Sequence, residues 1–283
     1  MTNSIEIRGL SKSYGDFALR DVSFTLPGGA IMGLIGENGA GKTTTIKCIL
    51  NLIRRDGGEI TLLGRDNLRE ERVAKEDVGV VLDECFFHDS LHPRDINAIL
   101  APVYRDWDSG LFRDYLDKFK LPQGKQVKDF SRGMKMKLSL AAALAHRPRL
   151  LILDEATAGL DPVVRDEVLD LFSEFTREEN HAVLISSHIV SDLEKICDYI
   201  AFLHRGKLLL CEEKDALKEE YGILRCTAEQ LSQLLPEAII GRKETAYGVE
   251  AIAARNAVPA GLPLSPIDIE ELFIFMVKEA NQR

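Results

Sequence analysis

The sequence predicts an α/β fold with a mainly parallel sheet, and three observations lead to that prediction. Continuous apolar runs of strand length recur along the chain, at residues 30–35, 78–82, 150–153 and 182–186. Segments with helical patterns separate these runs, and buried strands that alternate with helices are typical of a parallel sheet covered on both faces. The first run is also followed by a glycine-rich turn and then a helical segment, which is a strand–loop–helix unit.

Further elements are expected before, between and after these four strands. Alternating residues at 4–10 and 22–26 predict two strands of an N-terminal antiparallel subdomain, with a turn at 12–15 and a third strand at 59–63. Residues 84–147 are expected to form a largely helical subdomain, broken at its prolines. The remaining expectations are helices at 43–53, 162–179 and 189–196 and a strand pair at 199–204 and 207–211.

The character of the chain changes after residue 220, so we expect a nucleotide-binding domain over 1–220 and a small α+β accessory domain over 221–283. Short strands are predicted at 221–228, 238–241 and 248–253, around a helix at 228–235, and a last helix begins after a capping pattern near 265. A packing or dimerisation role is the simpler interpretation of this domain. A ligand-sensing module is the alternative.

Composition narrows the classes of protein that this chain can belong to. Its 283 residues carry a net charge of −9, which counts against general nucleic-acid binding. The five scattered cysteines indicate reduced thiols in a cytosolic protein, with no disulfide frame or zinc site. No apolar run approaches the roughly 18–20 residues that span a bilayer, so any membrane role is expected to depend on a partner.

The glycine-rich turn has the pattern of a phosphate-binding loop. It runs Gly36, Glu37, Asn38, Gly39, Ala40, Gly41, Lys42, Thr43, Thr44. Backbone N–H groups of such a loop form a nest for phosphate oxygens, and the helix that follows directs its positive end at them. Lys42 can reach the β- and γ-phosphates, and Thr43 can offer its hydroxyl to Mg²⁺. A glycine turn that merely starts a helix is the alternative, and the strand–loop–helix context favours the phosphate-binding loop.

Two acids follow a buried strand further along the chain. Asp154 and Glu155 come directly after the apolar run at 150–153. Asp154 is placed to hold Mg²⁺, and Glu155 is placed to polarise an attacking water. Ordinary solvent-facing acids are the alternative, which the phosphate loop upstream makes much less attractive.

Three more motifs follow in a fixed order around this acidic strand. Ser131 and Gly133 precede a long helix upstream of it, where a hydroxyl and a glycine can form a second anion site or serve as a simple helix cap. A Gly-Leu-Asp-Pro loop containing Asp161 follows the acidic strand, and His188 follows the next strand.

Together these motifs, in this order, resemble the nucleotide-binding subunit of ATP-binding cassette (ABC) transporters across residues 4–220. The resemblance implies an ABC-type cassette fold and an active ATPase that uses ATP and Mg²⁺. It also implies that two cassettes, identical or different, sandwich two ATP molecules head to tail.

The resemblance assigns roles to individual residues. Tyr14 matches the aromatic residue that stacks on adenine, although a tyrosine at a strand end is the alternative. Lys42 and the loop hold the phosphates, Glu155 is the general base, and His188 contacts the γ-phosphate. The resemblance further implies that Ser131 and Gly133 bind nucleotide on the second cassette, and that Asp161 forms part of the contact between cassettes.

The sequence departs from the family pattern in two places. After the strand at 78–82 the family usually has glutamine, whereas this chain has Asp83 followed by Glu84. Either acid can be the counterpart, and Asp83 is the expected Mg²⁺ ligand. Arg132 stands where the family commonly has glycine, but Ser131 and Gly133 are retained.

The expected function is to couple ATP-driven dimerisation to transport, by way of a separate polytopic membrane subunit. Export of a drug, peptide or lipid is favoured, with the chain cytoplasmic and peripheral on the inner face of the membrane. The apolar segment 85–88 could contact that subunit or belong to a local core. A soluble ATPase that remodels nucleic acid or ribosomes is the alternative.

Overall fold

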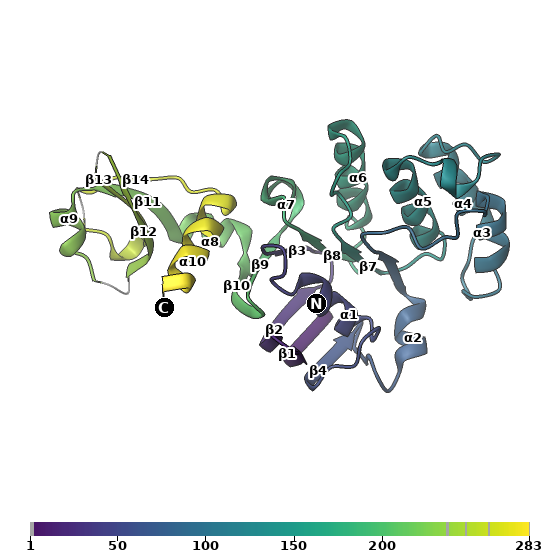
Figure 1. The fold of residues 1–283 in the computed structure, drawn as a ribbon, viewed down its shortest axis with the longest axis horizontal. Coiled ribbons are helices and arrows are strands. Elements are labelled where there is room, and N and C mark those ends of the chain that lie inside the picture. The colour runs from purple at the N-terminus through teal and green to yellow at the C-terminus, as the bar shows by residue number, and fades with distance from the viewer. Residues whose placement is uncertain (1–2, 236–237, 247, 260, 283) are drawn as a thin grey trace.

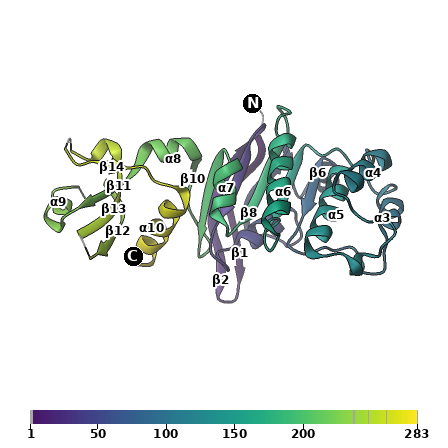
Figure 2. The same cartoon turned by 90° about the horizontal axis from the view of Figure 1, so that it is seen from above.

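The computed structural model describes residues 3–235, 238–246, 248–259 and 261–282. Within these ranges the chain forms three sheets in an elongated molecule: the N-terminal sheet lies below the central sheet in the view of Figure 1, and the C-terminal sheet lies beyond them at one end. Figure 2 shows the same arrangement from above, with the helical subdomain at one end and the C-terminal sheet at the other.

The first sheet is antiparallel and has the strand order β2-β1-β4-β5. Its strands are β1 (Asn3–Tyr14), β2 (Phe17–Pro27), β4 (Gly57–Leu62) and β5 (Arg65–Asp66). The turn was predicted at 12–15, and this prediction starts too early. Strand β1 stays paired with β2 as far as the Tyr14–Phe17 pair. Cross-strand pairing therefore outweighs the turn signal of these polar residues.

The second sheet is the core of the molecule and has the order β10-β9-β3-β8-β7-β6. Strands β3, β6, β7, β8 and β9 run parallel, and β10 pairs antiparallel at the edge. This confirms the mainly parallel sheet. The strands are β3 (Ile31–Ile35), β6 (Val78–Val81), β7 (Leu150–Asp154), β8 (Ala182–Ser187), β9 (Tyr199–His204) and β10 (Lys207–Glu213).

The continuous apolar runs exist because both faces of this sheet are covered. In β7, Leu151 and Leu153 face the cluster that includes the helical subdomain, while Leu150 and Ile152 face the cluster under the first sheet. The helices of this part are α1 (Lys42–Ile49), α2 (Glu71–Glu76), α3 (Pro93–Leu100), α4 (Ser109–Lys118), α5 (Arg132–Leu144), α6 (Pro162–Phe175) and α7 (Val190–Ile196).

Several element boundaries differ from the sequence expectations. Helix α1 ends at Ile49 rather than at residue 53, because Asn51 takes a left-handed backbone with φ 51° that stops the helix. Helix α6 ends at Phe175 rather than at residue 179. The sequence analysis also missed the short elements α2 and β5, as well as α8 (Lys214–Glu220).

The third sheet lies at the C-terminal end and has the order β12-β13-β11-β14. Its strands are β11 (Tyr221–Cys226), β12 (Ile239–Thr245), β13 (Gly248–Ala254) and β14 (Leu264–Ser265), accompanied by α9 (Ala228–Ser232) and α10 (Ile269–Gln282). Helix α10 lies between this sheet and the core (Figures 1 and 2). Phe273 on α10 packs against Phe202 on β9, with ring centroids 5.1 Å apart.

Candidate nucleotide site

The candidate site lies at the carboxyl edge of the central sheet, where three parallel strands end together. Strand β3 leads into the phosphate loop, β7 ends at Asp154, and β8 ends just before His188. The strands are held in register, and the Ser186 hydroxyl donates to Asp154 Oδ1 at 2.6 Å. In open α/β sheets ligands bind at this edge, outside the carboxyl ends of the strands.

The phosphate loop requires glycine at defined positions. Gly39 and Gly41 have φ of 81° and 111°, a backbone region that side chains disfavour. At Gly36 an added Cβ would lie 2.5 Å from the carbonyl oxygen of Leu203, so the loop can pass this strand only with glycine. The loop thus takes its shape from backbone constraints, and it begins helix α1 at Lys42.

Glu155 joins two of the expected catalytic residues. Its carboxylate lies 3.1 Å from Lys42 Nζ through Oε1 and 2.7 Å from His188 Nδ1 through Oε2. Its backbone has φ 51° and is held by its N–H, which donates to the Ser186 carbonyl and hydroxyl oxygens. A non-glycine residue kept in this conformation is typical of functional sites.

Lys42 is almost completely enclosed, with 5% of its side chain exposed. Besides its ion pair with Glu155, its ammonium group donates to the carbonyl oxygen of Gly36 at 2.8 Å. His188 is more open, with 47% of its side chain exposed. The site therefore has a buried cation, a bridging carboxylate and a solvent-facing imidazole in one connected set.

Asp154 has the character of a cation ligand. It is 1% exposed, and its Oδ2 has no hydrogen-bond partner among the described residues. Burial raises the pKa of this carboxyl, and the hydroxyls of Ser186 and Thr43 offset the rise in part. A buried carboxylate oxygen with an adjacent threonine hydroxyl suits a hard cation such as Mg²⁺. The donor set present therefore fits this ion.

Lys42, Glu155 and His188 line an open pocket of about 610 Å³, whereas Asp154 is not among its lining residues. Asp83 lines both this pocket and the neighbouring hollow, whereas Glu84 lines only that hollow, beside Cys85 and Lys135. Of the two acids that the sequence left open, Asp83 is thus the one at this pocket. The lining residues are Phe17, Glu37, Asn38, Gly39, Gly41, Lys42, Thr43, Thr44, Asp83, Arg132, Glu155, Ala158 and His188.

Other expected residues lie outside the lining of this pocket. Ser131 caps helix α5 by accepting from the Met134 N–H at 3.3 Å, and Asp161 caps α6 by accepting from the Val164 N–H at 3.1 Å. Tyr14 is 46% exposed, and the Lys12 ammonium lies 5.0 Å from its ring centroid. Gly133, near the start of α5, is also absent from the lining.

The sequence analysis missed three lining residues. Phe17 follows the hairpin turn after Tyr14, so it is an aromatic neighbour that no motif marked. Arg132 was noted only as a departure from the family pattern. Its guanidinium lies so close to Gly159 that a Cβ added to this glycine would be 2.7 Å from a guanidinium nitrogen. Ala158 belongs to that loop, and its methyl side chain carries no chemical signal.

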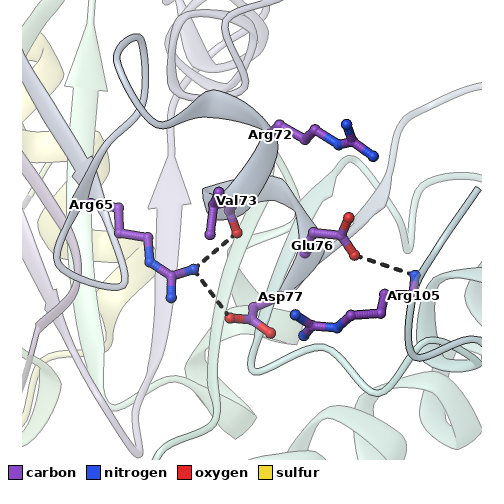
Figure 3. Close-up of a pocket in the computed structure, with 6 residues that line it drawn as sticks. All are labelled: Arg65, Arg72, Val73, Glu76, Asp77 and Arg105. Carbon is purple, nitrogen blue, oxygen red and sulfur yellow. Dashed lines mark hydrogen bonds and ion pairs between the residues drawn. The ribbon is translucent and has the colours of Figure 1, made fainter.

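A smaller hollow of about 160 Å³ near α2 carries charged residues but has the character of a structural contact (Figure 3). Arg65 donates to the Val73 carbonyl oxygen at 3.0 Å and lies 3.6 Å from Asp77. The backbone N–H of Arg105 donates to Glu76 at 3.4 Å. These interactions tie the first sheet to the helical subdomain.

Comparison with known proteins agrees with the geometry of the site. The family model described as "ABC transporter" matches residues 19–158. The ABC transporter ATP-binding protein YtrB of Bacillus subtilis is 36% identical over 77% of this chain and 74% of its own length. The bacitracin transport ATP-binding protein BcrA of Bacillus licheniformis is 35% identical over 74% of this chain and 69% of its own.

A solved ATP-binding subunit of an ABC transporter superposes with a TM-score of 0.69 and 27% identity, covering 76% of this chain and 91% of that one. The chain belongs to the ABC transporter ATP-binding proteins and is an ABC-type ATPase that binds nucleotide. In the part of the chain that the structure describes, no helix has the length and apolar character needed to cross a membrane.

Proposed function

We propose that this chain is the ATP-hydrolysing subunit of an exporter and works with a separate polytopic membrane subunit. The proposal rests above all on Glu155, whose carboxylate touches both the phosphate-loop lysine and the histidine after β8. A general base must lie within hydrogen-bond reach of the water that it activates. Glu155 is at the pocket wall, and its partners on both sides fix its direction.

The Lys42–Glu155 pair gives ATP binding a direct effect on the base. The Lys42 ammonium, 3.1 Å from Oε1 of Glu155, occupies this carboxylate. The phosphates of ATP compete for the same ammonium, because phosphate is the group that a phosphate-loop lysine binds. Lys42 then leaves Glu155 free to polarise water, while His188 stays within reach of the γ-phosphate.

Magnesium is proposed to bind through Thr43, Asp154 and Asp83, where it would neutralise charge on the phosphates. The chain's own contribution is the buried oxygen of Asp154, which the Ser186 hydroxyl orients through the other oxygen of the same carboxyl. We place the adenine against Tyr14, with Phe17 as the neighbouring aromatic wall of the pocket.

The active unit is proposed to be a pair of cassettes, identical or different, arranged head to tail. Ser131 and Gly133 lie at the start of α5, and Asp161 at the start of α6, outside the lining of the chain's own pocket. Helix N-termini attract anions, so these residues are free to meet a nucleotide held by a second cassette. ATP would join the two cassettes, and hydrolysis would let them separate.

The membrane subunit is proposed to contact the helical subdomain. In the segment 85–88, Phe86 is 71% exposed, whereas Cys85 and Phe87 pack against the main core. Cys85 and Phe87 therefore belong to the local core, whereas the exposed Phe86 is available to contact the membrane subunit. Helix α3 adds the exposed side chain of Ile99, and Val103 follows the helix. The transport of a drug, peptide or lipid is supported by the similarity to the bacitracin transport protein, and export is the direction that we propose.

The test uses the Glu155→Gln variant, which is expected to bind ATP without hydrolysing it and so to keep two cassettes together. The variant is loaded with ATP and used to capture partners from detergent-solubilised membranes. The matched control adds Lys42→Ala, which removes the phosphate contact and should release the partner cassette. A polytopic membrane protein captured by both variants and a second cassette captured only by the first would support the proposal. Capture of ribosomes, nucleic acid or soluble proteins alone would favour the remodelling alternative.

A further inference from the structure

A second and larger pocket lies between the central sheet and the C-terminal domain. It measures about 840 Å³ and is bounded by the β1–β2 and β9–β10 hairpins on one side and by β12 and α10 on the other. Figures 1 and 2 both show α10 beside β10 at this junction. Sites for small organic ligands typically enclose about 300–1,000 Å³, so the pocket has the size of a ligand site.

The two sides of this pocket differ in chemistry. The hairpin side carries the cationic residues Arg20, Arg205 and Lys207, none of which forms an ion pair with a carboxylate that the structure describes. Two acids also line the pocket, Asp16 and Glu279. The C-terminal side is mostly apolar, with Ile239, Ile240, Met276 and Ala280. Cations outnumber acids here although the whole chain carries a net charge of −9.

Arg205 occupies a position in the β9–β10 turn where a side chain is conformationally unfavourable. Its backbone φ is 46° and that of Gly206 is 76°, so both turn residues of the hairpin are left-handed. Turns of this kind favour asparagine, aspartate or glycine at the first position. At the second, an added Cβ would lie 1.9 Å from the carbonyl oxygen of Ala18, which explains the glycine. The turn itself gives no reason for an arginine.

The same hairpin is fastened to the phosphate loop. The Gly206 N–H donates to the Ala40 carbonyl oxygen at 2.9 Å. His204 is buried, and its ring lies 3.2 Å from Glu37 on the loop and 3.2 Å from Asn281 on α10. Gly39 lines both this pocket and the nucleotide pocket. The pocket that contains Arg205 therefore shares part of its wall with the phosphate site.

We propose that this pocket binds an amphipathic organic anion, with its charged head against the hairpin cations and its apolar body against α10 and β12. Binding there changes the affinity of the neighbouring site for ATP. Only this coupling rests on the proposed function, because the binding itself is a property of the pocket. By linkage, ATP must change the affinity for the anion by the same factor.

The experiment uses the full chain and the fluorescent probe 1-anilinonaphthalene-8-sulfonate, which combines a sulfonate with an apolar body. Arg205→Asn should weaken probe binding about tenfold, the typical effect of one charge-assisted contact. The same variant should melt at an equal or higher temperature, since asparagine suits the left-handed turn. The matched control is Arg72→Asn, which removes an arginine from the smaller hollow in Figure 3 and should leave probe binding unchanged.

The nucleotide titration separates a second site from an extension of the first. If there are two sites, the dissociation constant of the probe changes as the ATP concentration rises and then stays constant once the ATP site is saturated. If ATP instead displaces the probe completely, or if Arg205→Asn binds it as wild type does, the proposal is wrong. ATP binding is also measured without the probe. Normal ATP binding in that experiment shows that a negative probe result concerns the second pocket and not the ATPase assignment.

Displacement of the probe identifies the source of the anion. Octanoate below its micellar range represents soluble anions, and phosphatidylglycerol vesicles represent a membrane lipid, with phosphatidylcholine vesicles as the control. Displacement by octanoate supports a soluble organic anion, and displacement by the anionic vesicles alone supports a lipid. If neither displaces the probe, the assigned ligand class is wrong.

Discussion

The carboxyl edge of the central sheet and the junction with the C-terminal domain are built in different ways. At the edge, the side chains that we propose for catalysis are adjacent in sequence to strand ends, and parallel pairing brings them together. At the junction, residues from 16–20, 204–209, 239–240 and 276–280 are brought together only by the tertiary fold. The comparison teaches that a site recognisable from local sequence motifs can share a wall with a pocket that no sequence motif marks.

Removing the base at the edge should have the largest effect. Glu155→Gln keeps the shape of the side chain but cannot accept a proton, so ATP hydrolysis should fall by about 10²–10⁴-fold while ATP binding persists. Steady-state phosphate release and nucleotide titration measure the two quantities. A variant that hydrolyses ATP at more than half the wild-type rate would remove Glu155 from this role.

Removing the loop cation should weaken binding itself. Lys42→Ala should raise the dissociation constant for ATP about a hundredfold, since charge-assisted hydrogen bonds to phosphate are lost. Calorimetric titration is the measurement. Lys47→Ala, an exposed residue on the same helix, is the matched control and should bind ATP normally. Equal losses in the two variants would point to damage to the helix and count against a phosphate contact.

Loosening the junction should affect stability more than catalysis. Phe273→Ala removes the ring that packs on Phe202 and should lower the free energy of unfolding by about 2–4 kcal/mol. Denaturant unfolding measures the loss. If α10 contributes nothing to the core, the variant will unfold at the wild-type midpoint.

Neutralising the buried acid should have the smallest effect and should be stabilising. Burial raises the pKa of Asp154, so the folded state holds this proton more tightly than the unfolded chain does. Stability from this group is present below its unfolded pKa and is lost as the pH rises through the folded pKa. At neutral pH, Asp154→Asn should therefore melt a few degrees higher.

The melting curves can be checked against pH and metal. The gain from Asp154→Asn should shrink as the pH falls from the raised folded pKa of Asp154 toward the ordinary aspartate range and should vanish below that range, and Asp170→Asn, an exposed control on α6, should show no gain. Mg²⁺ with ATP should stabilise wild type but not the Asp154 variant. A variant that gains as much from Mg²⁺ as wild type would exclude Asp154 as a ligand.

Short-range patterns determined most of the nucleotide edge from the sequence alone. Glycine spacing, an apolar strand and the polar residue after it are local features, and parallel strands place their carboxyl ends at one edge whatever the rest of the chain does. This is why the loop, Glu155 and His188 could be named in advance. It also explains the correct choice of a parallel sheet.

The tertiary structure decided what depends on residues distant in sequence. It chose Asp83 over Glu84 at the pocket, added Arg132 to the pocket lining, and placed α10 against β9. Each of these results depends on packing between segments distant in sequence, and a single chain's local pattern carries no record of such contacts. The sequence by itself determined which side chains follow the strand ends, because that is a local property, whereas only the packed fold placed those side chains beside a second pocket.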